Sequence, residues 1–118
     1  NLNFSLDNLF NTNTFLKVKC ITLNKIMEKY SFSKIDVLKL DIEGVADQVI
    51  IKALKDKLNI DQICFELERP LNLLKQYNYF TRYLKLIKLL RKNNYILFNC
   101  TQLKLGLRSE ILAIKRYE

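Results

Sequence analysis

The chain contains no histidine and no tryptophan, and it has only two glycines, one proline and three cysteines among its 118 residues. The lack of histidine excludes nucleophilic sites of the Ser-His or Cys-His type, and it argues against a zinc site built from cysteine and histidine. The cysteines Cys20, Cys64 and Cys100 are far apart and form no C-x-x-C pair. We therefore expect buried free thiols in a reducing compartment, which predicts a cytoplasmic protein.

The scarcity of glycine and proline leaves no linker to divide the chain and no glycine-rich loop for a phosphate group. We expect a single domain over residues 1–118, in which residues 1–14, rich in Asn, Thr and Ser, are irregular. The sequence begins with Asn1, so we interpret it as a segment of a longer chain or as one whose start is missing. No signal peptide is visible and no apolar run approaches the ~18 residues of a membrane span, so no membrane partner is expected.

The charge balance is basic, with twenty Lys and Arg against twelve Asp and Glu, a net charge of +8. A nucleic-acid surface requires clustered arginines, aromatic platforms or a recognisable binding motif. Here lysine outnumbers arginine fifteen to five, and the basic residues are spread along the chain. We therefore expect no nucleic-acid partner, although a basic adaptor for an acidic partner or nucleic acid remains a weaker alternative.

Hydrophobic periodicity predicts alternating strands and helices. The strands are expected over residues 15–21, 35–40, 62–67, 95–99 and 110–116, with the 35–40 strand buried. Thr22 caps a short helix, a second helix follows Gly44 and continues to residue 58, and the third is strongest over residues 81–92. This order predicts an α/β fold with a mostly parallel sheet, in which the last two strands pair as an antiparallel hairpin at one edge.

The residues that follow the 35–40 strand are the first candidates for chemistry. Asp41 and Glu43 come directly after it, and Lys39 lies within it. In open α/β sheets, ligands bind outside the carboxyl ends of the strands, where a carboxylate can accept a substrate proton. The alternative is structural, with Glu43 capping the next helix, Asp41 bonding a neighbouring backbone group, and Lys39 serving as an edge residue or a charge partner.

Two further groups of charged residues have competing interpretations. Glu66 and Glu68 end the next strand, so neighbouring strands would gather four acids at one rim, where a hard cation could bind. Polar strand ends in solvent are the alternative. A basic stripe follows one face of the third helix, and we interpret it as a solvated face in preference to a site for an anionic partner. Its members are Arg82, Lys85, Lys88 and Arg91.

Several of these segments together resemble the FkbM-type family of S-adenosylmethionine-dependent methyltransferases. The likeness covers roughly residues 15–116, and the acidic strand motif is its most specific part. The matching segments are Thr22-Leu-Asn24, Ile35-Asp-Val-Leu-Lys-Leu-Asp-Ile-Glu-Gly44, Val49, Ala53, a strand ending in Glu66, Asn94-Tyr95 and Glu110-Ile-Leu-Ala-Ile-Lys115.

The resemblance implies a Rossmann-like sheet and methyl transfer from S-adenosylmethionine to a hydroxyl of a small molecule or glycan, typically a sugar or a natural product. It places Lys39, Asp41 and Glu43 beside the methyl donor and acceptor, as catalytic candidates. The family's usual aspartate, second glutamate and glycine are replaced by Asn24, Ala46 and Lys52.

The glycine-rich strand and turn that hold the cofactor in this family have no counterpart in the sequence, so the chain corresponds to the C-terminal portion of such a domain. An alternative is a non-catalytic remnant or interaction module with a truncated fold. We expect the isolated 118 residues to bind S-adenosylmethionine weakly or not at all. Tight binding in isothermal titration calorimetry would contradict this expectation.

Overall fold

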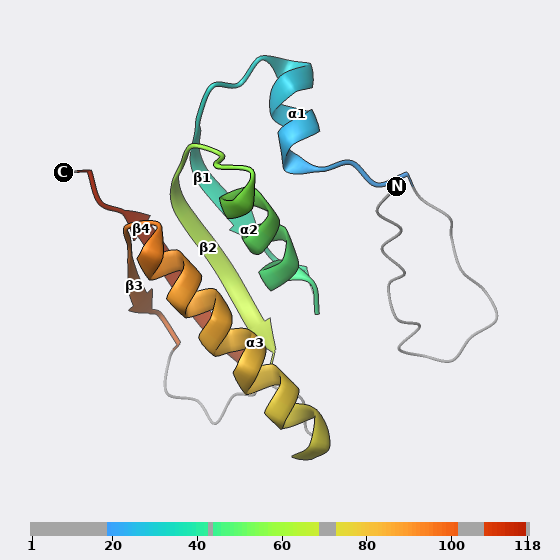
Figure 1. Cartoon of the computed structure of the whole chain (residues 1–118), viewed down its shortest axis with the longest axis vertical. Helices are drawn as coiled ribbons and strands as arrows, with labels where there is room; N and C mark the ends of the chain where they lie inside the picture. The colour runs from blue at the N-terminus through green and yellow to red at the C-terminus, as the bar shows by residue number, and fades with distance from the viewer. Residues whose placement is uncertain (1–18, 43, 69–72, 102–107, 118) are drawn as a thin grey trace.

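The computed structural model describes residues 19–42, 44–68, 73–101 and 108–117, which form three helices and four strands (Figure 1). Residues 1–14, which we expect to be irregular, lie outside this part, as does most of the strand expected over residues 15–21. Residues 19–21 are described and do not form a strand. The elements are α1 (Leu23–Tyr30), β1 (Ile35–Leu40), α2 (Ala46–Lys55), β2 (Ile60–Glu68), α3 (Leu73–Lys92), β3 (Tyr95–Asn99) and β4 (Arg108–Lys115).

The four strands form one mixed sheet in the order β1-β2-β4-β3. β1 and β2 pair in parallel, whereas β4 pairs antiparallel with both β2 and β3. The β3–β4 pair confirms the expected hairpin, but the expectation of a mostly parallel sheet is not confirmed. The strand-helix alternation correctly gives β1, β2 and β3 the same direction. It does not reveal that β4 inserts between β2 and β3, which makes two of the described pairings antiparallel.

Local sequence signals explain where the helices begin and end. The Thr22 side chain accepts a hydrogen bond from the Lys25 backbone N–H at 3.4 Å, as expected of a cap at the start of α1. α2 ends at Lys55, earlier than expected, because the chain turns through Lys57 at φ 55°. Asn94 adopts φ 64° and allows the chain to reverse from α3 into β3.

Helices α2 and α3 lie side by side against one face of the sheet (Figure 1). Apolar side chains alternate along the strands, so Ile63 and Phe65 of β2 point toward the helices and are buried. The side chains that are fully buried come from both layers, and burial of this kind is the main favourable term in folding. They are Ile50, Ile60, Ile63, Leu86 and Leu90.

The opposite face of the sheet is open in the described part of the chain. Val37 of β1 is 55% exposed, and Ile96 and Phe98 of β3 are 37% and 47% exposed. The prediction that residues 35–40 form a buried strand is therefore wrong for these described residues. β1 lies at the end of the described sheet and is covered on one face only, by the helices, so Leu38 is its one buried side chain.

A buried tyrosine connects β3 to β2 across the intervening strand. The Tyr95 hydroxyl donates a hydrogen bond to the Ile60 carbonyl oxygen at 2.6 Å, and the Tyr95 side chain is nearly inaccessible to solvent. Burial raises the pKa of Tyr95 to about 12, because a phenolate would lose its hydration there.

Among the described residues, no helix is long and apolar enough to span a membrane.

Truncating Leu86 tests whether the contact between α3 and the sheet supplies stability. Leu86 is fully buried, so Leu86→Ala should lower the free energy of unfolding by about 2–5 kcal/mol through lost burial and a new cavity. Leu84→Ala is the matched control on the same helix. Leu84 is 62% exposed, and its loss should cost less than about 0.5 kcal/mol. Equal effects of the two variants in urea unfolding would contradict this packing.

Ionisation of Tyr95 predicts a loss of stability at alkaline pH. The folded pKa of about 12 lies above the usual value of 10, so burial stabilises the neutral phenol. The contribution of Tyr95 is complete below pH 10 and disappears as the pH rises through 12. Tyr95→Phe should cost about 1–3 kcal/mol at pH 8 by leaving the Ile60 carbonyl unpaired. The stability gap between wild type and variant should narrow by pH 11; a gap that is constant or widens would contradict the assignment.

Candidate functional site

The carboxyl ends of β1 and β2 and the start of β4 surround a hollow of about 290 Å³. Lys39 of β1 and Asp41, directly after that strand, line it together with Glu66 of β2 and Glu110 of β4. The sheet register places Lys39 beside Cys64 and places Glu66 opposite Glu110. The structure therefore brings together two of the predicted site residues, and it joins them to the predicted acid of the neighbouring strand.

Strand alternation determines on which side of the sheet these groups lie. Ile63, Phe65 and Leu67 are buried under the helices, so Cys64 and Glu66 belong to the opposite, open face. The Glu110 position, which pairs with Glu66, shares that face. The charged groups of the hollow thus lie at the rim of the open face, where a ligand can reach them. Among the apolar residues that line it, Leu112 pairs with Cys64 and forms the apolar wall on this face, whereas Phe65 and Ile111 are buried toward the helices.

The remaining predicted acids are not part of this hollow as the structure describes it. Glu43 lies outside the described residues, so its proposed role stays a prediction. Glu68 ends β2, where its backbone pairs with Arg108. No group of three or more metal-binding side chains occurs among the residues that the structure places, so the possibility of a cation at the rim gains no support.

The cysteines differ from the expected buried thiols. All three are free, but Cys20 and Cys100 are exposed and Cys64 is half-buried. Cys20 precedes α1 in a segment without regular structure, and Cys100 directly follows β3 at the rim. Both Cys64 and Cys100 line the hollow. Apolar flanking residues suggested burial, but these positions lie outside the layer between helices and sheet.

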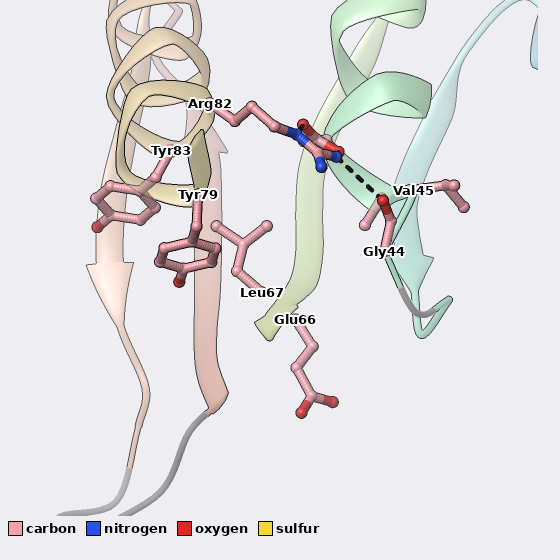
Figure 2. A pocket seen from close by; sticks show the side chains of 9 residues that line it. Gly44, Val45, Glu66, Leu67, Tyr79, Arg82 and Tyr83 are labelled. Atoms are coloured by element: carbon pink, nitrogen blue, oxygen red, sulfur yellow. Dashed lines mark hydrogen bonds and ion pairs between the residues drawn. The ribbon is translucent and has the colours of Figure 1, made fainter. Parts of the chain in front are cut away.

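A second, smaller hollow of about 60 Å³ lies between the start of α2, the end of β2 and one face of α3. Figure 2 shows Arg82 reaching from α3 toward Gly44, while the carboxylate of Glu66 points away from the guanidinium. Arg82 Nε donates to Asp47 Oδ2 at 2.8 Å, and its Nη2 donates to Asp47 Oδ1 at 2.6 Å. The same Nη2 donates to the Gly44 carbonyl oxygen at 3.0 Å.

These contacts revise the interpretation of the basic stripe. Lys85, Lys88 and Arg91 are exposed, as expected of a solvated face, but Arg82 forms an ion pair with a buried carboxylate. The exposed fraction of Asp47 is 5%, and its hydrogen bonds from Arg82 raise the pKa of the guanidinium. Sequence analysis missed Asp47, because no local pattern connects it to a partner 35 residues away. The only available signal was the presence of an arginine at position 82, because the planar guanidinium group suits two-point pairing with a carboxylate better than a lysine does.

The arrangement can bind a polar ligand and accept a proton. Asp41 is exposed at the mouth of the larger hollow, so its carboxylate can accept a hydrogen bond from an incoming hydroxyl group. Lys39 adds a cationic donor on the same strand end. A rim of carboxylates and one ammonium group beside an apolar wall is typical of a site for a small molecule that has several hydroxyl or amino groups.

Comparison with known proteins supplies the family. No curated protein and no solved structure matches the chain. The family profile described as Methyltransferase FkbM domain matches residues 3–97, which is most of the chain and includes β1, the loop after it, β2 and α3. The match covers Lys39, Asp41 and Glu66 of the larger hollow and both partners of the Arg82–Asp47 ion pair. The chain therefore belongs to the FkbM methyltransferase domain family.

Proposed function

We propose that this FkbM-family chain belongs to an S-adenosylmethionine-dependent O-methyltransferase that acts on a hydroxyl group of a sugar or natural product. The observation that carries the proposal is the larger hollow, where Asp41 and Lys39 lie with Glu66 and Glu110 at the carboxyl ends of parallel strands. Ligands of open α/β sheets bind at this end. Family membership supports methyl transfer as the class of reaction and S-adenosylmethionine as the usual donor of the family.

The chemistry of the hollow suits the polar groups of such a donor, while the glycine-rich turn that holds the donor in this family has no counterpart in the sequence. Carboxylates accept hydrogen bonds from hydroxyl and ammonium groups and favour a nearby positive charge, and Glu66 and Glu110 are the residues that would hold these groups. Leu112, which pairs with Cys64 on the open face, offers an apolar surface for a flat ring. The volume of about 290 Å³ lies at the lower limit of pockets for small molecules. When bound, S-adenosylmethionine supplies a methyl group on a positively charged sulfur as the electrophile.

The residues of this chain would orient the acceptor and remove its proton. An acceptor hydroxyl that donates a hydrogen bond to Asp41 gives its proton to that carboxylate as the oxygen becomes a nucleophile. The Lys39 ammonium group can donate hydrogen bonds to other oxygens of a small-molecule or glycan acceptor and so fix its orientation. A neutral amide at position 41 could still accept a hydrogen bond, but it could not take the proton.

The substitution Asp41→Asn tests this role. In the full-length gene product it should lower the rate of methyl transfer by roughly 10²–10⁴-fold, the usual contribution of a general base. The measurement is transfer of tritiated methyl from S-adenosylmethionine to a panel of hexoses and N-acetylhexosamines. Asp36→Asn is the matched control, since Asp36 is an exposed acid of β1, the strand that precedes Asp41, and pairs with Lys34 at 2.8 Å. It should leave the rate nearly unchanged.

Two results would contradict the proposal. Equal rates for Asp41→Asn and Asp36→Asn would remove Asp41 from the proton transfer. Absence of saturable S-adenosylmethionine binding by the full-length product would favour the alternative, a non-catalytic interaction module with this fold. A basic adaptor for an acidic partner would instead bind in a way that weakens steeply with added salt.

A further inference from the structure

We propose that Arg82 is a positioning residue for the site, because it holds the loop between β1 and α2 that carries Asp41. The role of Arg82 in catalysis rests on the proposed function, whereas the claim that Arg82 holds the loop does not depend on it. Arg82 does not line the larger hollow, although it lines the smaller one together with Glu66. Its effect on Asp41 would pass through Gly44 and Asp47.

The three hydrogen bonds of Arg82 bracket the point where the loop becomes a helix. Two of them reach Asp47 in the first turn of α2, at 2.8 and 2.6 Å, and the third reaches the Gly44 carbonyl oxygen at 3.0 Å. Gly44 is three positions beyond Asp41, and Asp41 directly follows β1. The loop is therefore fixed by the sheet at one end and by Arg82 at the other. A shift of Gly44 would be passed to Asp41 over a very short distance.

Other means of holding this end of the loop are weak in the structure. Gly44 adopts φ +73°, and a side chain placed there would meet no heavy atom within 4 Å, so packing does not confine it. The N-cap residue of α2 is Val45, which supplies no side-chain hydrogen bond to the helix. Helix starts without such a cap fray more easily. The guanidinium contact to the Gly44 carbonyl is a side-chain hydrogen bond to the loop itself, beside the two that reach Asp47.

Burial explains why the contact should persist. Asp47 is 5% exposed, so its carboxylate would be left as an uncompensated buried charge if Arg82 moved away. Because half of the Arg82 side chain is exposed, breaking this pair costs less than breaking a fully buried pair but more than breaking a solvated surface pair. The planar guanidinium can satisfy both carboxylate oxygens and still direct Nη2 to the carbonyl, which a lysine ammonium on a flexible stem does not reproduce.

A purely structural ion pair between α2 and α3 makes a different prediction. It would change the stability of the whole chain and leave the local order of the loop unchanged relative to the core. A positioning role instead loosens the described residues 41, 42 and 44–49 more than the sheet. The two possibilities are separated by residue-specific measurements, because global unfolding affects all protected amides together whereas local opening does not.

The test compares Arg82→Met with Arg91→Met by nuclear magnetic resonance on the full chain. Arg91 is an exposed residue in the last turn of the same helix, so its replacement removes the same charge away from the loop. Arg82→Met should lower the heteronuclear NOE of Ile42 and Gly44. It should also raise amide exchange at Gln48 and Val49, whose N–H groups bond to the Val45 carbonyl, about tenfold more than at core strand amides. Arg91→Met should do neither.

Every outcome bears on the proposal. Equal loop behaviour in the two variants, or a uniform rise of exchange at the loop and at the β2 core, would overturn it. If Arg82→Met does not fold, Arg82→Lys replaces it, because it retains a charge for Asp47. A loosened loop in that variant supports the clamp, and a loop like that of the wild type contradicts it. An intact clamp without methyl transfer would refute the proposed function alone, whereas an unaffected loop with an inactive Asp41→Asn would refute the clamp alone.

Discussion

The insertion of β4 between β2 and β3 is the constraint on which the site depends. Antiparallel pairing places Ile111 beside Phe65 and Glu110 beside Glu66, so the last strand brings an acid to a rim that β1 and β2 alone would leave incomplete. The same insertion separates β3 from β2. The hydrogen bond from the Tyr95 hydroxyl to the Ile60 carbonyl connects these two strands across β4. Backbone hydrogen bonds thus determine which side chains meet, and the loops provide Asp41 and Cys100 at the margin.

Local patterns in the sequence predict much of this fold, because each strand and helix has its own hydrophobic period. The direction of β1, β2 and β3, the terminal hairpin and the meeting of Asp41 with Glu66 all follow from alternation. The position of β4 could not be predicted, because alternation gives directions and does not give neighbours. The Arg82–Asp47 pair and the open face holding Val37 depend on contacts between distant segments, for which a single sequence carries no signal.

The candidate site and the chain as a whole carry charges of opposite sign. The net charge is +8, yet the larger hollow has three carboxylates, from Asp41, Glu66 and Glu110, against the single ammonium group of Lys39. At physiological ionic strength, charges separated by more than about 8 Å in solvent are largely screened. A ligand at the rim therefore experiences mainly the local groups, so the overall basic character says little about what binds there.

Gly44 shows how the requirements of a position can be separated into size and handedness. Its backbone lies in the left-handed region at φ +73°, but open space surrounds the place where a side chain would project. Sterically, residues larger than glycine fit, and the obstacle for an L-residue is the conformational cost of roughly 1–2 kcal/mol. The mirror-image configuration removes that cost. At this junction the fold therefore discriminates by chirality: D-alanine satisfies the same backbone that L-alanine strains.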